Sequence, residues 1–574
     1  MRRRRLWLLV FVLVILGWAA AAAASLLRAR TDLEAGLASV QRAQKLTTPA
    51  DLVAGRPLPD LRDAAAAFER GHDRLSSPLV APLKILPIAG RQLRSATALA
   101  GASARITNVG RDAVGEAQRA LQRPNGTGAE RIALLRDLGR VAADADRRLE
   151  GIDLGPSAAL IGTLADKRAD AQERLEDMRA GLRDGGAAAT GLADLLQGPR
   201  RYLLMAANNS EMRAGSGMFL SIGEVTFTDG AFALGDFRPA GELYVDTPPT
   251  ITDTDLADRW GWLNPNKEWR NLGASPRFDV SAELATRMWV AKGGRPVDGV
   301  LALDPIAVEA IVEATGPVEV AGRRFEAGSV DDFLLYEQYA GITAVGGPAQ
   351  AARREVLGLF AKAAFDNVQR GGWDLPKLAS TLARAARGRH VMGWATRPDE
   401  QRVWEGAHVD GRLDESSLMV SLLNRSANKL DRFVDVDADL SLRPDGGGTA
   451  AELRVTVRNT APEGLPLYVG GPHPGSPVGG GDYFGILSVN LPGYAGDIDS
   501  DGGEPAAAGN DGPTRVHAVP VTVLRGESKT VTFRFRLAAP SGQLLVEPSA
   551  RVPAVSWTAP GGSWKSGESR RVSW

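Results

Sequence analysis

The feature that most constrains this chain is an uncharged apolar run at residues 6–27, which follows four arginines at residues 2–5. The run has 22 residues, and as a helix it would measure about 33 Å, enough to cross a hydrocarbon core of about 30 Å. Basic residues favour the cytoplasmic side of a membrane. We therefore predict a cytoplasmic tail at 1–5, a single transmembrane helix at 6–27, and the bulk of the chain outside the cytoplasm.

A cleaved signal peptide is the alternative interpretation of the same run. The alanines at 19–24 are small residues of the kind found at cleavage sites, but the apolar stretch of a signal peptide usually has about 7–15 residues. The longer run favours an uncleaved anchor.

Length, charge and cysteine content narrow the class of protein. The chain of 574 residues is too long to fold around a single hydrophobic core. Its length indicates about three or four domains. The 68 basic residues are balanced by 68 acidic ones, which argues against nucleic-acid binding because phosphate contacts require clustered excess Lys and Arg. The sequence has no cysteine, which excludes disulfides, thiolate catalysis and Cys-ligated metal centres.

Residues 28–198 have the pattern of amphipathic helices. Apolar residues recur every three or four positions, as at Ile132, Leu135 and Leu138, which is the helical period. Proline and glycine pairs divide the stretch and predict four or five antiparallel helices. Such a bundle is either a stalk that spaces the rest of the chain from the bilayer or a surface that binds a partner.

Strands and helices alternate in the next region. Short apolar runs at 202–206, 218–227 and 297–303 have the length of buried strands. Asp304 followed by Pro305 is typical of a helix start. This alternation predicts a central α/β domain at residues 199–430.

The central region resembles a bacterial family known as domain of unknown function 4012. The segment YLLMAANNSEMRAGSGMF, residues 202–219, contains the Asn-Asn-x-Glu-x-Arg motif of that family. Three later segments, at 297–320, 351–363 and 424–434, follow in the expected order. The resemblance also extends to the anchor and the helical stretch, and it implies no particular activity.

The order of elements is also similar to the LytR-CpsA-Psr family, membrane-anchored phosphotransferases that move polyprenyl-linked glycopolymers onto the cell wall. Glu211-Met212-Arg213 falls where that family has Asp-x-Arg, and Arg353-Arg354-Glu355 falls near its arginine-rich helix. The resemblance implies that Glu211, Arg213, Arg353 and Arg354 line one ligand site. Guanidinium groups would bind a pyrophosphate there, and a carboxylate would hold magnesium.

Two departures from that family leave catalysis open. Gly215-Ser216-Gly217 stands where the family has Arg-Ser-Asp, and Tyr336-Glu337-Gln338 stands where it has Tyr-x-Arg. One arginine and one metal-binding aspartate are thus missing. An active chain would be a phosphotransferase-like glycopolymer ligase that uses magnesium. In an inactive chain Arg213 would form a structural salt bridge or fix the loop.

The last part of the chain, residues 431–574, shows the period-two alternation of half-buried strands. We predict an antiparallel β-sandwich-like domain interrupted by a Gly- and Pro-rich loop at 461–513. Asp497, Asp499 and Asp501 match the first half of a calcium loop, but position twelve is Ala508 where that loop has a glutamate. The alternative for these residues is an exposed acidic turn.

Two functions are consistent with these features. The first is a single-pass extracytoplasmic protein of the cell envelope that binds or transfers a polyprenyl-linked or wall polysaccharide. The second is a noncatalytic scaffold of the cell envelope with a degenerate phosphotransferase-like domain. The sequence predicts a membrane association for both and identifies no protein partner.

Overall fold

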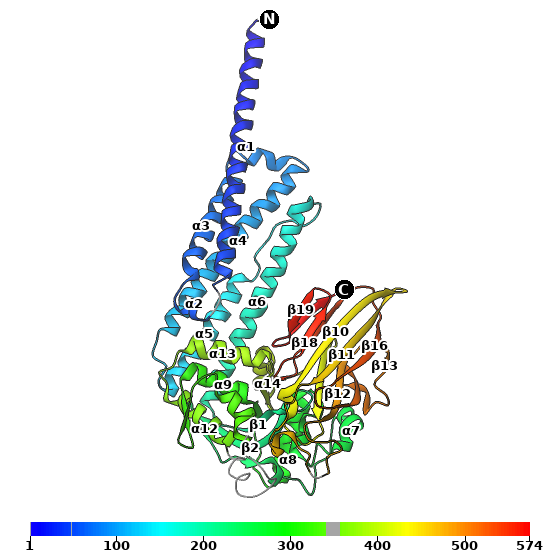
Figure 1. Ribbon diagram of the computed structural model, residues 1–574. Helices are drawn as coiled ribbons and strands as arrows, with labels where there is room; N and C mark the ends of the chain where they lie inside the picture. Colours follow the sequence, from blue (N-terminus) through cyan, green and yellow to red (C-terminus); the bar gives the residue numbers. More distant parts are fainter. Residues whose placement is uncertain (1, 47–48, 340–355, 474) are drawn as a thin grey trace. The chain divides into compact units, whose positions relative to one another are not determined.

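The computed structural model describes residues 2–46, 49–339, 356–473 and 475–574. The chain divides into two compact units. The first comprises Met1–Asn125 and Glu130–Ala193, and the second comprises Gly126–Ala129 and Asp194–Trp574. The protein is therefore multidomain, with a helical first unit and a second unit that holds most of the strands (Figure 1).

The first unit is built from long helices, as the apolar period predicts (Figure 1). Its members are α1 (Arg2–Gln44), α2 (Pro49–Val53), α3 (Pro57–Ser76), α4 (Ala89–Leu121), α5 (Gly128–Leu149) and α6 (Gly162–Gln197). Small residues let these helices approach closely. A Cβ atom added at Gly36 would lie 2.8 Å from the ring of Phe68, and one added at Gly71 would lie 2.8 Å from Leu33.

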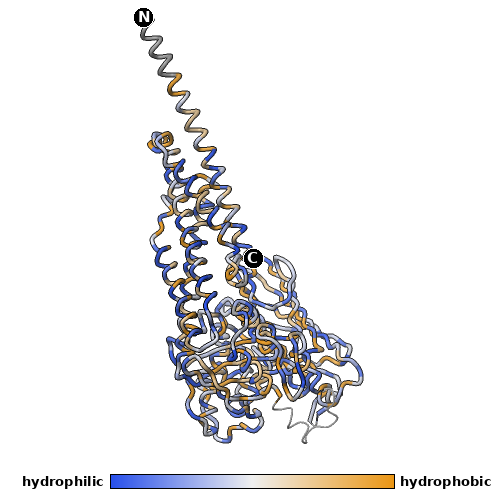
Figure 2. The backbone as a smooth tube through the Cα atoms, turned by 90° about the vertical axis from the view of Figure 1, so that its left-hand side faces the viewer, coloured by the Kyte–Doolittle hydropathy of each residue, from blue (hydrophilic) through white to orange (hydrophobic). Residues whose placement is uncertain are grey.

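The predicted transmembrane run and the first bundle helix are one continuous helix, α1, which contains Gly17 and Gly36 but no proline. Among the described residues, α1 is the one helix long and apolar enough to cross a membrane, and an amino-terminal signal sequence has the same properties. Figure 2 shows hydrophobic residues in the part of α1 that extends beyond the other helices of its unit.

A six-stranded mixed sheet forms the centre of the second unit. Its order is β3 (Ala231–Leu234), β2 (Gly217–Thr228), β1 (Arg200–Met212), β5 (Gly299–Leu303) and β8 (Val391–Ala395), with β4 (Arg238–Pro239) paired to β2. Strands β1 and β5 are parallel, whereas β1 pairs with β2 and β5 pairs with β8 in antiparallel fashion.

Helices accompany this sheet and contribute to a core on each of its faces. They are α7 (Thr254–Trp260), α8 (Phe278–Ala291), α9 (Pro305–Thr315), α10 (Val330–Leu335), α12 (Val356–Arg370), α13 (Leu375–Arg387) and α14 (Pro398–Gly406). Met205 and Ala207 of β1 join the core that contains α8, whereas Ala206 between them joins the core of α9, α10 and α12. Alternate residues of a strand point to opposite faces, so β1 is buried on both sides.

Two further six-stranded sheets share one apolar core and form a sandwich. One has the order β13 (Gly496–Ser500), β16 (Ser528–Leu537), β11 (Gly448–Asn459), β10 (Val434–Asp445), β18 (Ser556–Ala559) and β19 (Gly562–Lys565). The other has the order β14 (Ala507–Asp511), β15 (Thr514–Val523), β12 (Tyr483–Pro492), β9 (Ser417–Asn424), β17 (Gln543–Glu547) and β20 (Arg570–Ser573). The pairs β10–β18 and β9–β17 are parallel, and the remaining pairs are antiparallel.

Two sequence expectations about the sandwich differ from the structure. Strand β9 lies within the stretch assigned to the central domain, yet it pairs with β12 and β17 of the sandwich. Residues 461–513, expected as a loop, contain β12, β13 and β14. Every residue of β9 and β12 except Phe484 is buried. Strands buried on both faces lack the alternation that identified the other sandwich strands.

Candidate functional site

The motif that contains Glu211 and Arg213 covers the end of β1 and the first residue of the turn to β2. The turn closes through the Arg213 N–H, which donates to the carbonyl oxygen of Ser216 at 2.8 Å. A Cβ atom at Gly217 would lie 2.3 Å from the carbonyl carbon of Asn208, so a glycine is required for this close approach. The turn holds Glu211 and Arg213 inside the second unit, where both are buried.

The Glu211 carboxylate forms a buried ion pair. Lys429 Nζ donates to Glu211 Oε2 at 2.6 Å, and it lies 4.5 Å and 5.4 Å from the ring centroids of Tyr339 and Tyr468. Burial alone would lower the pKa of Lys429, but the charge of Glu211 and the two tyrosines outweigh it and raise that pKa. Asn208 Nδ2 donates to the Tyr339 hydroxyl at 2.8 Å and fixes one wall of this cation site.

The Arg213 guanidinium is directed at main-chain carbonyls. Its Nε donates to Arg270 O at 2.9 Å, and its Nη1 donates to Met212 O at 2.9 Å and to Asn424 O at 3.0 Å. Its Nη2 donates to the side chain of Asn271 at 3.3 Å. The Arg213 residue is only 4% exposed. Its contact with Asn424 connects the β1–β2 turn to the end of β9.

A second buried ion pair lies beside the first. Arg551 Nη1 donates to Asp431 Oδ1 at 3.0 Å, and both side chains are almost fully buried. The Asp431 carboxylate also accepts the Met212 N–H at 3.0 Å, the Asn424 side-chain amide at 2.8 Å and the Tyr483 hydroxyl at 3.1 Å. The Met212 main chain, inside the motif, is thus held by Asp431, a residue of the segment between β9 and β10.

The Asn209 side chain contributes another tie between the sheet and the sandwich. Asn209 Nδ2 donates to Asp304 Oδ2 at 2.8 Å and to Ala550 O at 2.7 Å. The same Asp304 oxygen lies 2.6 Å from His390 Nδ1, while its Oδ1 caps α9 by accepting the N–H groups of the first turn. The predicted helix start at Asp304 is therefore confirmed.

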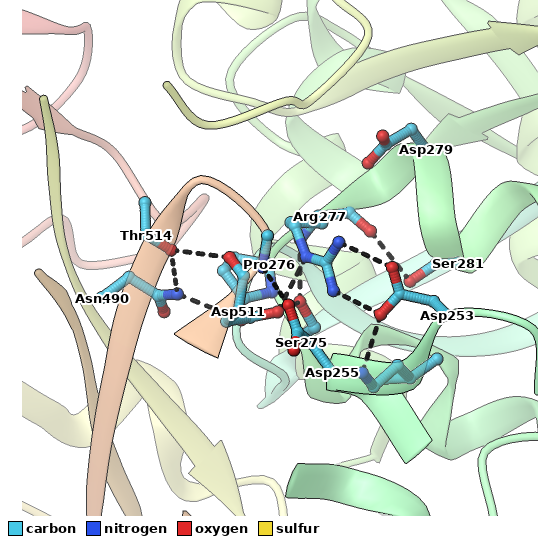
Figure 3. Close-up of polar contacts among 12 residues, drawn as sticks. Asp253, Asp255, Ser275, Pro276, Arg277, Asp279, Ser281, Asn490, Asp511 and Thr514 are labelled. Carbon is cyan, nitrogen blue, oxygen red and sulfur yellow. Dashed lines mark hydrogen bonds and ion pairs between the residues drawn. The ribbon is translucent and has the colours of Figure 1, made fainter. Parts of the chain in front are cut away.

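A third network joins the segment before α8 to strand β14 (Figure 3). Arg277 Nε donates to Asp511 Oδ1 at 2.7 Å, while its Nη1 and Nη2 donate to Asp253 at 2.9 and 2.6 Å. Ser275 and Asn490 also donate to the Asp511 carboxylate. The dashed lines in Figure 3 show that Arg277 lies between Asp253 and Asp511, so the network connects segments that are distant in sequence.

Arg425 follows Asn424, the last residue of β9. Among the described residues of this region, it is the positively charged side chain that has no carboxylate partner. Its guanidinium carbon lies 5.8 Å from the ring centroid of Trp262, and the Trp262 indole is 52% exposed. Burial lowers the pKa of Arg425. Burial, and after it the charge of Arg425, also lowers the pKa of Arg213 to about 10.

Two of the other predicted site residues, Arg353 and Arg354, lie outside the described residues. The three aspartates of the predicted calcium loop are described. Asp497 and Asp499 are exposed on β13, and the Asp501 carboxylate accepts the Thr532 N–H at 2.7 Å.

The donor set at the motif does not fit magnesium. Its one predicted ligand, Glu211, is occupied by Lys429. No group of three or more His, Cys, Asp or Glu side chains within the described part of the chain is arranged to hold a metal ion.

Several residues of this region are not identified by the sequence analysis. Lys429 and Asp431 lie in the segment 424–434, whose family resemblance could have marked them. Arg277, Asp511 and Arg551 have no comparable signal, because single charged residues in polar segments resemble any solvated surface position. Their ion-pair partners lie more than one hundred residues away, except in the Arg277–Asp253 pair.

Comparison with known proteins identifies one family. Residues 197–339 match the model described as protein of unknown function (DUF4012). No curated protein and no solved structure matches the chain, and none of these comparisons supports the resemblance to the LytR-CpsA-Psr family. The matched segment contains β1, β2, Glu211 and Arg213, and it supports the DUF4012 family for this chain.

Proposed function

We propose that this protein is a membrane-anchored, noncatalytic scaffold of the cell envelope whose second unit is a rigid platform. The observation that carries the proposal is the set of hydrogen bonds that Arg213 donates within the protein. A residue that binds a pyrophosphate must present its donors to the ligand, whereas the donors of Arg213 are directed at four protein oxygens.

Glu211 supports the same interpretation. Its carboxylate has a buried cation 2.6 Å away, and an ion pair removed from water is disrupted only at a large cost. A metal ion or a reacting group would have to displace Lys429 from this position. We infer that the Asn-Asn-x-Glu-x-Arg motif of this chain holds the sheet against the sandwich.

The rigidity of the platform follows from a shared core as well as from the ion pairs. Leu423 of β9 and Ile486 of β12 belong to the same apolar cluster as Leu203 of β1 and Phe278 of α8. Leu422 and Leu487, their sequence neighbours, belong to the sandwich core. The sheet that contains β9 and β12 thus has an apolar core on each face. If the central sheet or the other sheet of the sandwich moved independently of it, apolar surface would be exposed to water.

A transfer assay tests the proposal directly. Full-length protein in lipid nanodiscs is given a labelled polyprenyl-linked glycan, an acceptor glycan and Mg²⁺. We expect no transfer above that of empty nanodiscs. Transfer that Arg213→Lys abolishes, while the melting temperature of the variant equals that of the wild type, would overturn the scaffold proposal.

One observation favours a second candidate function, the binding of an acidic envelope glycan without turnover. Arg425 and the half-exposed Trp262 lie together, and an arginine beside an exposed aromatic ring suits a ligand that has both carboxylates and apolar sugar faces. The Trp262 indole is held in place because its Nε1 donates to Arg259 O at 3.1 Å.

Calorimetric titration with hexagalacturonate, an acidic oligosaccharide, tests this candidate against neutral cellohexaose. We expect binding of the acidic probe alone, weakened in Trp262→Ala and Arg425→Gln. Tyr244→Ala is the matched control, because Tyr244 is a comparably exposed aromatic residue of the same unit. Equal affinity of all four proteins for the acidic probe, or no binding by any of them, would contradict a site at Arg425.

A further inference from the structure

The connection between α3 and α4, residues 77–88, exposes an unusual amount of apolar surface. Ile85 is 84% exposed and Ile88 is 70% exposed, and Leu79 and Leu86 are more than 40% exposed. The segment contains a short 3-10 helix, Ala81–Ile85, with no buried residue. Contiguous exposed apolar side chains mark a surface that binds a membrane, a protein or a ligand.

This connection lies at the level where the apolar run of α1 ends. Ser25 Oγ donates to the carbonyl oxygen of Arg74 at 3.3 Å, two residues before the end of α3 at Ser76. Leu26 packs in one cluster with Leu75 and Leu93. Figure 1 shows the connection between α3 and α4 beside α1, on the side toward the amino terminus.

A second loop meets the first at the same end of the bundle. Gln92 Nε2 donates to Ala159 O at 3.0 Å, and the Ile161 N–H donates to Gln92 Oε1 at 3.2 Å. Ile161 itself is 63% exposed. The two loops together form what we call the bundle tip, defined as residues 77–88 and 159–161.

Basic residues accompany the bundle tip. Lys84, Arg91 and Arg94 lie in or directly after the first loop, and residues 77–111 contain no Asp or Glu. Arg94 Nη1 donates to Lys84 O at 2.5 Å, which keeps this charge at the loop. Cationic side chains next to apolar ones match a membrane surface, where lysine and arginine attract anionic headgroups.

We propose that the bundle tip inserts into the headgroup region of the same membrane that α1 crosses, as a second, interfacial contact with lipid. The inference rests on the proposed anchoring by α1. A helix over residues 6–27 spans about 33 Å, so its end near Ser25 reaches the boundary of a hydrocarbon core of about 30 Å. The residues that follow Ser76 extend past this level and meet the interface.

The absence of cysteine from the sequence allows a direct test. Single-cysteine variants Ile85→Cys and Ile88→Cys of the full chain are labelled with an environment-sensitive fluorophore and reconstituted into liposomes. We expect a blue shift of the label, and a loss of fluorescence when the liposomes contain headgroup-level nitroxide lipids. Met178→Cys is the matched control, because Met178 is 40% exposed and lies about 24 Å along α6 from Gly162.

A fourth label separates the two proposals. Leu16→Cys reports whether the apolar run lies in the bilayer, through quenching by nitroxides placed deep in the acyl chains. Quenching at Leu16 together with solvent-exposed labels at Ile85 and Ile88 would overturn the interfacial contact while leaving the anchor intact. No quenching at Leu16 would overturn the anchor itself. If unlabelled Ile85→Cys or Ile88→Cys protein forms disulfide-linked dimers with an added oxidant, and the labelled protein shows no quenching by lipid, the bundle tip is assigned to self-association.

Discussion

Lys429 Nζ lies 2.6 Å from Glu211 Oε2, and the two side chains belong to segments 218 residues apart in the sequence. The pair is buried and is flanked by the rings of Tyr339 and Tyr468. A buried charge without its partner is strongly destabilising, whereas removal of both charges is much less so. Comparing the single and double substitutions therefore measures how much the Glu211–Lys429 pair stabilises the motif.

We expect Lys429→Met to lower the free energy of unfolding by about 3–5 kcal/mol, because Glu211 is left unpaired in the interior. Glu211→Gln combined with Lys429→Met is expected to cost less than the sum of the single changes. Urea unfolding of the full chain in detergent, followed by tryptophan fluorescence, measures the difference as a double-mutant cycle.

The exposed pair of Arg397 and Asp399 is the control for that cycle, since both side chains are at least half exposed. Exposed ion pairs contribute about 0–1 kcal/mol. A coupling energy for Glu211 and Lys429 as small as that of the control would show that the buried pair does not stabilise the motif.

Gly217→Ala tests the close approach at the β1–β2 turn. The added Cβ would lie 2.3 Å from the carbonyl carbon of Asn208, so the turn must open, and overpacking of this kind costs about 1–3 kcal/mol. Gly241→Ala is the matched control, because nothing lies within 4 Å of a Cβ there. The melting temperatures of the two variants are compared, and equal values would contradict the assigned geometry.

Arg213→Lys separates charge from hydrogen-bond geometry. Lysine keeps the positive charge but cannot reach the carbonyl oxygens of Arg270, Met212 and Asn424 together. Each buried acceptor left without a donor costs about 1–3 kcal/mol, so the free energy of unfolding should fall by at least that amount. Arg425→Lys is the control. An Arg213→Lys variant as stable as the wild type would show that the three contacts are dispensable.

The sequence predicts the local features of the fold well, because each has a local physical cause. The strand at 202–206 and the helix after Asp304 are confirmed, since apolar runs and N-caps act over a few residues. The sandwich strands β10 and β11, which have one solvent-exposed face, are also found where the alternation of apolar and polar residues predicts them. The boundary predicted at residue 430 places β9 in the central domain, because the apolar pattern of a doubly buried strand does not show which sheet it joins.

The environment of the motif depends on partners that only the folded chain brings together. The sequence places the polar segment that contains Glu211 and Arg213 in a loop between two strands, whereas in the structure β1 extends through Glu211 to Met212. The family resemblance of segment 424–434 could have marked Lys429 and Asn424, but the sequence does not show that these residues, more than two hundred positions later, would surround Glu211 and Arg213. An arginine that binds main-chain carbonyls and one that binds a phosphate look the same in a sequence, because both use the same donors.

The Arg277 network gives the stability a defined pH dependence. Burial alone would raise the pKa of Asp253, but the hydrogen bonds from Arg277 and from the Leu256 N–H, together with the Arg277 charge, hold it below its ordinary value of 3.8. The unfolded state therefore binds more protons than the folded state as the pH falls below 3.8. The stabilisation by Asp253 is present above this pH and is lost as the pH falls through the folded-state pKa.

Asp253→Asn is expected to remove this dependence. Asparagine can still cap α7 by accepting the Leu256 N–H, but it loses the charged hydrogen bonds to Arg277, which are worth about 1.5–3 kcal/mol at neutral pH. Urea unfolding at neutral pH and at several pH values below 3.8 should show the gap between wild type and variant narrowing in acid. Asp246→Asn is the control, because Asp246 is 84% exposed and 3.5 Å from its partner Lys292. A gap that stays constant or widens in acid would mean that Asp253 is not held ionised by Arg277.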